Sequence, residues 1–216
     1  MSSPALCAGG AGLLTSPCAQ KGKRLASNAT RRSKAKARAR HTDGLTRPGS
    51  GTTQAPGLGP RRILWASNAP WATTGYGEQT AQVVTRAKQE GHSIAVAANY
   101  GLEGTRFDWE DIPVFPRGLD GYSNDVIPAY AMDWGKPSGQ QPLVVTLFDC
   151  WVFRGAGWGL LDRIASWVPI DHFPVPDGVA EWLRNDNVTP IAMSQFGRDA
   201  IERLNIETRY IPHAID

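Results

Sequence analysis

Apolar runs alternate with stretches of helical periodicity from residue 61 to residue 216. Uninterrupted apolar runs of this length are typical of strands that are buried on both faces of a parallel sheet. The runs occupy residues 63–66, 93–98, 112–115, 142–149, 164–170, 189–193 and 209–212. The run at 142–149 is the longest that is rich in β-branched residues, so it predicts a strand at the centre of the sheet.

Helix signals lie between these runs. Residues 81–90 place apolar positions on one side, and Gly91 follows where a left-handed cap would end a helix. Residues 125–134 form a second helical pattern, Asp177 is expected to cap a third helix, and Ser194 to cap a fourth. Strands that alternate with helices predict an α/β fold with a doubly wound, mostly parallel, Rossmann-like sheet.

The loop at residues 67–80 separates the first predicted strand from its helix and contains Gly75, Tyr76 and Gly77. Glycines next to a helix start, at the carboxyl end of a strand, place backbone amides where a phosphate can bind. Glycines before a helix are also ordinary turn residues. The local sequence leaves both interpretations open.

Charge divides the chain into two parts. Residues 1–60 contain ten Lys or Arg and one acid, whereas residues 61–216 contain thirteen Lys or Arg and nineteen acids. The first part is rich in small and polar residues that can bury little apolar surface, so we expect a disordered basic tail at 1–60 and a folded domain at 61–216. The tail is expected to be a solvated extension, a targeting segment, or an arm that contacts a polyanion by counterion release.

Neither a membrane segment nor a metal site is predicted. No run reaches the roughly 18 apolar residues that span a bilayer, and the apolar stretch at 5–14 lacks a preceding positive cluster. Three cysteines, Cys7, Cys18 and Cys150, provide neither a disulfide framework nor a zinc-type spacing. These features favour a cytoplasmic location, and the spacing of the four histidines gives no metal ligand set.

Several enzyme classes are disfavoured by missing motifs. No Gly-x-Gly-x-x-Gly follows the first strand, which argues against a nicotinamide enzyme. The chain also has no Asp-x-Asp, no Gly-x-Ser-x-Gly and no Walker loop.

Five segments, taken in their order, resemble the amino-terminal domain of glycosyltransferase family 4, whose members have the GT-B fold. The resemblance covers residues 62–216. The segments are Ser67-Asn68 through Thr74-Gly75-Tyr76-Gly77, then Gly91 to Val96, Trp167 to Pro174, Ala192 to Gly197, and Tyr210 to Asp216.

The resemblance implies a retaining, metal-independent hexosyltransferase that uses a nucleotide-sugar as co-substrate and no cofactor. In this family the first Rossmann-like domain mostly holds a sugar or glycoconjugate acceptor, and the second holds the donor. The family's glycine-rich loop, which approaches the donor phosphates, falls on Gly75, Tyr76 and Gly77. The second domain, with its pair of glutamates, is absent from this sequence, so we expect a fragment that needs a donor-binding domain or a partner chain.

Catalytic positions transfer less directly. Many relatives have a histidine near the end of the central strand, where this chain has Thr146, Phe148 and Asp149. Asp149 and His172 are the candidate catalytic residues, and Asp171 is a candidate acceptor contact. The alternatives are that Asp149 caps the next segment and that Asp171 and His172 form an ordinary turn.

Eight tryptophans divide by position. Trp71, Trp151 and Trp158 fall in loops at strand ends, where an amphipathic ring can face a sugar or close the cleft, although packing is favoured for most of these rings. Trp71 and Trp151 are the candidate sugar contacts. The pattern places Trp65, Trp134, Trp167 and Trp182 in the core.

A second functional hypothesis comes from another class. The chain would be a non-catalytic sugar-binding or scaffold module that uses its basic tail to bind a polyanion such as nucleic acid.

Overall fold

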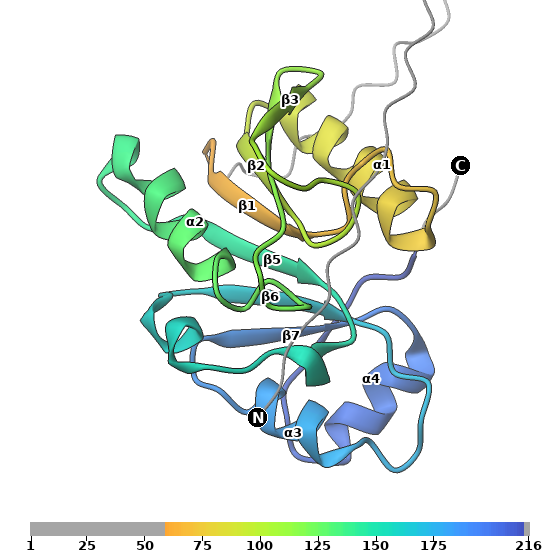
Figure 1. The fold of residues 1–216 in the computed structure, drawn as a ribbon. Coiled ribbons are helices and arrows are strands. Elements are labelled where there is room, and N and C mark those ends of the chain that lie inside the picture. Colours follow the sequence, from red (N-terminus) through yellow and green to blue (C-terminus); the bar gives the residue numbers. More distant parts are fainter. Residues whose placement is uncertain (1–58, 214–216) are drawn as a thin grey trace, which may run out of the picture. The chain divides into compact units, whose positions relative to one another are not determined.

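A computed structural model describes residues 59–213 of the chain. These residues form one eight-stranded sheet and four α-helices (Figure 1). The strands are β1 (Arg62–Ser67), β2 (Ser93–Ala98), β3 (Phe107–Trp109), β4 (Ile112–Phe115), β5 (Leu143–Leu147), β6 (Ile164–Val168), β7 (Val188–Ala192) and β8 (Arg209–Tyr210). The α-helices are α1 (Gly75–Gln89), α2 (Ile127–Gly135), α3 (Asp177–Leu183) and α4 (Gln195–Glu202). The tail predicted at 1–60 lies outside the described residues, apart from Gly59 and Pro60.

The strand order is β3-β4-β2-β1-β5-β6-β7-β8. All neighbouring strands run parallel except β3 and β4, which form an antiparallel hairpin. The parallel α/β sheet predicted from the apolar runs is therefore confirmed. β1 and β5 are the two central strands, which confirms the central position predicted for residues 142–149. In their register Trp65 pairs with Val145.

The helices divide unequally between the two faces of the sheet. Val84 of α1 packs with Trp65, Val96 and Trp167 on one face. α2, α3 and α4 contribute apolar residues to the core on the other face, together with the segment that follows β5. Parallel sheets need cover on both faces, and here one helix covers one face while three cover the other.

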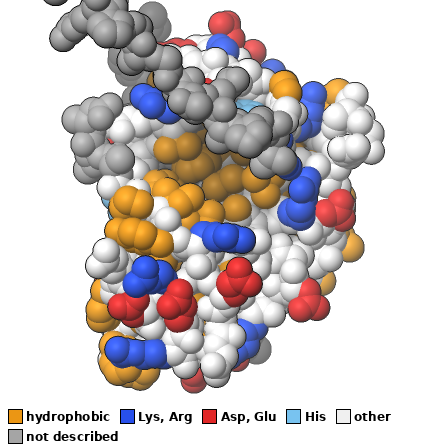
Figure 2. All heavy atoms as spheres, turned by 180° about the vertical axis from the view of Figure 1, so that it is seen from behind, with side chains coloured by type: hydrophobic (Ala, Val, Ile, Leu, Met, Phe, Trp, Pro, Cys, Tyr) orange, Lys and Arg blue, Asp and Glu red, His pale blue; other side chains and the backbone are white. Residues whose placement is uncertain are grey.

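Within residues 59–213, no helix covers the α1 face over β5, β6 and β7. A cavity of about 310 Å³ on this face is lined only by apolar residues, among them Ile63, Val145 and Ile191. Apolar side chains gather in a hollow in the view of Figure 2. Trp65 and Trp167 meet edge to face in this part of the core, with ring centroids 6.2 Å apart.

The start of α1 differs from the sequence-based prediction. The helix begins at Gly75, six residues before the predicted start at 81, so Gly75, Tyr76 and Gly77 are its first three residues and not a loop. Glycines before a helix are ordinary turn residues, so a loop was expected here, and glycine also has a low helix propensity. The Thr74 side chain overrides this propensity because its hydroxyl accepts a hydrogen bond from the Gly77 amide at 3.0 Å.

The end of α1 is as predicted. Gly91 has a φ of +87°, a left-handed conformation that glycine adopts without strain. The amides of Gly91 and His92 donate to the carbonyls of Lys88 and Ala87, at 2.9 and 3.0 Å. This pair of bonds is the Schellman arrangement that closes a helix before a strand.

The cap of α4 is confirmed and that of α3 is not. The Ser194 hydroxyl accepts from the Gly197 amide at 2.9 Å. Asp177 was expected to be the cap of α3, but Pro176 occupies that position and Asp177 is the first helical residue. A carboxylate in the first turn still has a favourable interaction with the helix dipole. Three short 3₁₀ segments, η1 (Lys136–Ser138), η2 (Cys150–Val152) and η3 (Ala156–Leu160), were not predicted.

Candidate functional site

The strand order has its switch point at β1 and β5, and the region just outside the carboxyl ends of these two strands is called the β1–β5 crevice. From β1 the chain builds the sheet toward β2 and β4, and from β5 it continues toward β6, β7 and β8. The Ser67 hydroxyl at the end of β1 donates to the Leu147 carbonyl at the end of β5, at 3.1 Å. Open α/β sheets bind their ligands at this kind of switch point, just outside the strand ends.

Two predicted site residues meet across this crevice. The Tyr76 hydroxyl, from α1, donates to Oδ2 of Asp149, which follows β5, at 3.2 Å. The Tyr76 ring lies edge to face with Phe148, with centroids 6.4 Å apart. Asp149 itself is exposed, so its carboxylate is accessible to a ligand.

Burial and negative charge keep the Tyr76 hydroxyl protonated. Burial of the ring is the largest cause that raises the Tyr76 pKa well above the ordinary tyrosine value, and the Asp149 carboxylate is the next. Asp171 adds a smaller contribution to the same pKa through its charge. Tyr76 is therefore a fixed hydrogen-bond donor over the whole physiological pH range.

The two glycines of the predicted phosphate loop have different surroundings. The Gly77 amide already donates to Thr74, and a Cβ added at Gly77 would lie 2.1 Å from the Ala72 carbonyl oxygen. Gly77 thus allows close packing of the preceding loop against α1. Gly75 has nothing within 4 Å of an added Cβ, and among residues 59–213 its amide and that of Tyr76 have no acceptor. These two amides are the ones that can meet a ligand.

Asp171 and His172 contact each other and stay at the edge of the site. Nδ1 of His172 contacts Oδ1 of Asp171, and both side chains are largely exposed. Asp171 influences Tyr76 electrostatically. No hydrogen bond in the described part of the chain joins His172 to Tyr76 or Asp149. Asp171 thus affects Tyr76 only through its charge, and in the described part of the chain both Asp171 and His172 lie outside the hydrogen bond of Tyr76 with Asp149.

The two candidate sugar-contact tryptophans lie in different places. Nε1 of Trp71 donates to the Gly101 carbonyl at 2.9 Å, and the Trp71 ring packs against Phe107, so this side chain is tied to the segment after β2. Trp151 is 59% exposed, and its ring lies edge to face with Tyr122, with centroids 6.1 Å apart. Neither ring contacts Tyr76 or Asp149 through a described interaction.

Five further tryptophans lie in the core or pack against it. Trp158, one of the three rings predicted near strand ends, lies in η3 and is only 4% exposed, so it packs in the core, as was favoured for most of these rings. Its ring packs against Phe153 and Trp182, and its Nε1 donates to Asn124 Oδ1 at 2.9 Å. The core positions expected for Trp65, Trp167 and Trp182 are confirmed, and Trp134 is partly buried against the core.

A polar network that the sequence analysis missed supports the loop after β5. Asn124 Oδ1 accepts from the Arg154 amide at 3.0 Å as well as from Trp158, and Asn124 Nδ2 donates to Asp120 Oδ1 at 2.9 Å. The Arg154 guanidinium pairs with Asp120 at 2.9 Å. The Tyr122 amide first, and then Arg154, lower the Asp120 pKa well below its usual range. The sequence signal for this network was the glycine-rich segment that directly follows the predicted strand at 142–149.

Cys150 lies next to Asp149 but is buried. Burial raises the pKa of its thiol to about 12, so the thiol stays protonated and is a poor nucleophile. Among residues 59–213, no group of three or more His, Cys, Asp and Glu is arranged to hold a metal ion.

No helix within the described residues is long and apolar enough to cross a bilayer.

Comparison with known proteins gives no family assignment. No protein-family model matches the chain, and no curated protein matches it significantly.

Proposed function

We propose that the chain is the acceptor-side domain of a retaining, metal-independent glycosyltransferase of the GT-B type. The parallel α/β sheet, with its crevice between β1 and β5, is compatible with the first of the two Rossmann-like domains in such enzymes. The ordered resemblance to family 4 supports the same proposal. The alternative folds of glycosyltransferases that use an Asp-x-Asp metal site are disfavoured because the sequence lacks that motif.

The observation that carries the proposal is the contact between Tyr76 and Asp149 across the crevice. The Tyr76 hydroxyl donates to Asp149 Oδ2. Oδ1 therefore remains available to accept a hydrogen bond from a hydroxyl group of the sugar that receives the transferred unit. Because the Tyr76 hydroxyl keeps its proton, the pair holds one orientation at neutral pH. A fixed acceptor hydroxyl reduces the entropic part of the barrier to transfer.

The start of α1 supplies the donor-side contribution in this proposal. The free amides of Gly75 and Tyr76 and the positive end of the helix dipole would interact with the diphosphate of a nucleotide-sugar. Negative charge grows on that diphosphate as the glycosidic bond breaks, so preorganised donors lower the barrier. Gly77 has a packing role and not a donor role.

The donor-binding domain would have to be supplied in addition to this one, on a longer chain or by a partner. The 216-residue chain alone is then expected to bind an acceptor weakly and to show no turnover. Transfer assays with uridine and guanosine diphosphate sugars would detect activity if the second domain is provided. Turnover by the 216-residue chain alone would contradict this division of roles.

A binding experiment tests the acceptor site directly. The full chain is titrated with a panel of mono- and disaccharide acceptors and followed by NMR. Asp149→Asn should weaken acceptor binding by about tenfold, which is a typical loss for one charge-assisted hydrogen bond. Asp162→Asn is the matched control. Asp162 is also exposed, but it precedes β6 and so lies at the amino-terminal ends of the strands, opposite the crevice. Equal affinities for the two variants, or no acceptor binding at all, would overturn the proposal.

The second candidate function is a non-catalytic sugar-binding or scaffold module. The excess of nine positive charges in residues 1–60 favours it, because such an arm binds polyanions by counterion release. Deletion of residues 1–60 should then abolish a salt-sensitive interaction with nucleic acid and leave acceptor binding unchanged. If the deletion changes no interaction, this candidate loses its support.

A further inference from the structure

A second cavity lies between the segment that follows β5 and helix α3. It has a volume of about 490 Å³, within the range of about 300–1,000 Å³ that is typical of small-molecule sites. Tyr76, Asp149 and the glycines of α1 do not line it. We propose that this cavity binds a neutral polyhydroxylated ligand, a carbohydrate unit of hexose size, at a site separate from the β1–β5 crevice.

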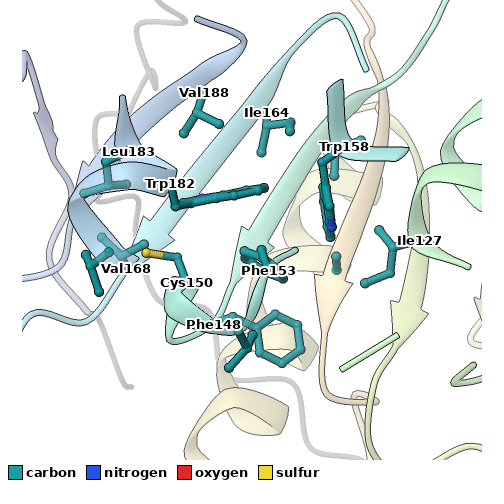
Figure 3. Packing of buried hydrophobic residues seen from close by; sticks show 14 of the residues in the cluster. Ile127, Phe148, Cys150, Phe153, Trp158, Ile164, Val168, Trp182, Leu183 and Val188 are labelled. Carbon is teal, nitrogen blue, oxygen red and sulfur yellow. The ribbon is translucent and has the colours of Figure 1, made fainter. Parts of the chain in front are cut away.

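The floor of the cavity is aromatic and rigid. Phe153 packs against both Trp158 and Trp182 with centroids 4.7 Å apart, and the two indoles are 5.2 Å apart (Figure 3). All three side chains are nearly fully buried, so the floor is fixed before any ligand binds. The rim carries Trp151, whose ring is mostly exposed. The exposed indole of Trp151 can pack against the C–H face of a sugar, and the buried aromatic cluster beneath it needs no rearrangement.

Two asparagines of the lining are oriented by the backbone. Asn187 Nδ2 donates to the carbonyls of Trp158 and Leu161, at 2.9 and 2.8 Å. Asn185 Nδ2 donates to the carbonyl of Trp182 at 2.8 Å. In the described part of the chain no donor reaches either Oδ1 atom. Each residue therefore offers a fixed oxygen acceptor whose direction the backbone bonds determine.

The charges of the lining disfavour an anion. The exposed Glu181 carboxylate has no ion-pair partner among residues 59–213, and it adds further acceptor oxygens. The one cation of the lining, Arg154, is paired with Asp120. A phosphate or carboxylate would thus meet acceptors, whereas a ligand with several hydroxyl donors would find partners. Hydroxyl donors combined with apolar C–H faces are the characteristic chemistry of a carbohydrate.

Bare backbone at the rim leaves room for such a ligand. A Cβ added at Gly155 or Gly159 would meet nothing within 4 Å, and one at Gly178 would lie 3.8 Å from Trp151 Cβ. Gly159 has no positive φ, so a larger residue fits there without backbone strain. This glycine provides a way to block the cavity without altering the core.

Indole NMR of the full ¹⁵N-labelled chain tests the proposal. The probes are glucose, galactose, mannose, N-acetylglucosamine and their β- and α-linked disaccharides, with inorganic phosphate as the anionic probe. At least one sugar should bind with a roughly millimolar Kd and shift the indole signal of Trp151. Gly159→Val and Trp151→Ala should each weaken that binding by about tenfold or more.

Control variants separate this cavity from the crevice. Tyr100→Ala removes an equally exposed aromatic ring far along the sequence from α3 and should leave the affinity unchanged. Asp149→Asn should also leave the affinity of the cavity for the sugar unchanged, because Asp149 does not line it. The same substitution should weaken acceptor binding at the crevice, so failure of the crevice as an acceptor site and failure of the cavity give different results. Thermal melting of each variant checks that the fold is retained.

The proposal is overturned if no sugar shifts the Trp151 signal. It is equally overturned if a sugar binds with the same affinity to the Gly159→Val and wild-type proteins, or if phosphate binds in place of the sugars.

Discussion

Gly75 and Gly77 are separated by one residue, yet the structure gives them different roles. Gly75 is exposed with open space around its α-carbon, whereas Gly77 is buried against the loop that precedes α1. A pattern of two glycines before a helix cannot distinguish these roles, because the distinction depends on where the Ala72 carbonyl lies after folding. Of the two glycines, only Gly75 has an amide without an acceptor among residues 59–213.

Substitution of these two glycines by alanine should have different effects on stability. Gly77→Ala should lower the free energy of unfolding by about 1–3 kcal/mol, because its methyl group would collide with the Ala72 carbonyl. Gly75→Ala should leave it unchanged or raise it by up to about 1 kcal/mol, since alanine restricts the unfolded chain. Urea denaturation midpoints at equal slope measure both. A stable Gly77→Ala protein would show that the loop can move away.

Tyr76 should make stability depend on alkaline pH. Its pKa is raised in the folded protein, so above about pH 10 the unfolded chain loses a proton that the folded chain keeps. The contribution of Tyr76 is complete below that pH, and stability should fall as the pH rises through and above it. Tyr76→Phe should reduce this loss of stability. A titration followed by phenolate absorbance should show that one of the tyrosines with a raised pKa is missing in the variant. The same alkaline slope in both proteins would contradict the prediction.

At the scale of elements, the loop after β5 depends on the loop before α2. The segment from Cys150 to Leu160 forms two short 3₁₀ turns with few backbone bonds to the sheet, and side chains of Asn124 and Asp120 hold it in place. Asp149 directly precedes this segment, and residues of the segment line the second cavity. Asn124 therefore positions both candidate sites without lying in the crevice.

Removal of the Asn124 side chain should loosen this segment. Asn124→Ala leaves the buried Nε1 of Trp158 without an acceptor, which should cost about 1–3 kcal/mol in the free energy of unfolding. In a Trp158→Phe background the cost should be smaller by at least roughly 0.5 kcal/mol, because phenylalanine has no donor to satisfy. A double-mutant cycle by urea denaturation measures the difference. Additive effects would mean that the hydrogen bond contributes nothing to stability.

The elements that sequence predicted well are those with uninterrupted apolar runs. β2 and β4 have the predicted bounds, and β1 and β5 lie within a residue or two of theirs, because burial on both faces leaves a local signature. The start of α1 and the 3₁₀ turns were missed because a side-chain cap and long-range hydrogen bonds determine them. For the candidate site, the position of Asp149 at a strand end was readable. Its contact with Tyr76 was not, because that contact requires the pairing of β1 with β5.

At the scale of the whole molecule, protection should decrease from the centre of the sheet to its edges. β1, β5 and β6 are hydrogen-bonded on both sides and deeply buried, whereas β8 is an exposed two-residue edge strand and β3 a mostly exposed one. Native-state amide exchange should therefore be slowest in β1, β5 and β6 and fastest in β3 and β8. Mass spectrometry of the exchanged protein gives the ranking. Equal protection of β8 and β5 would contradict the sheet order.

The bond between Ser67 and Leu147, which ties the central strands, joins residues 80 positions apart in the chain. During synthesis β1 can pair with β2 soon after both have been made, but its other edge has no partner until β5 follows. An unpaired strand edge is a template for association between chains, and non-local pairings of this kind form slowly. The nascent chain is thus most vulnerable to aggregation in the interval before β5 pairs with β1. The strand that completes the crevice also ends that interval.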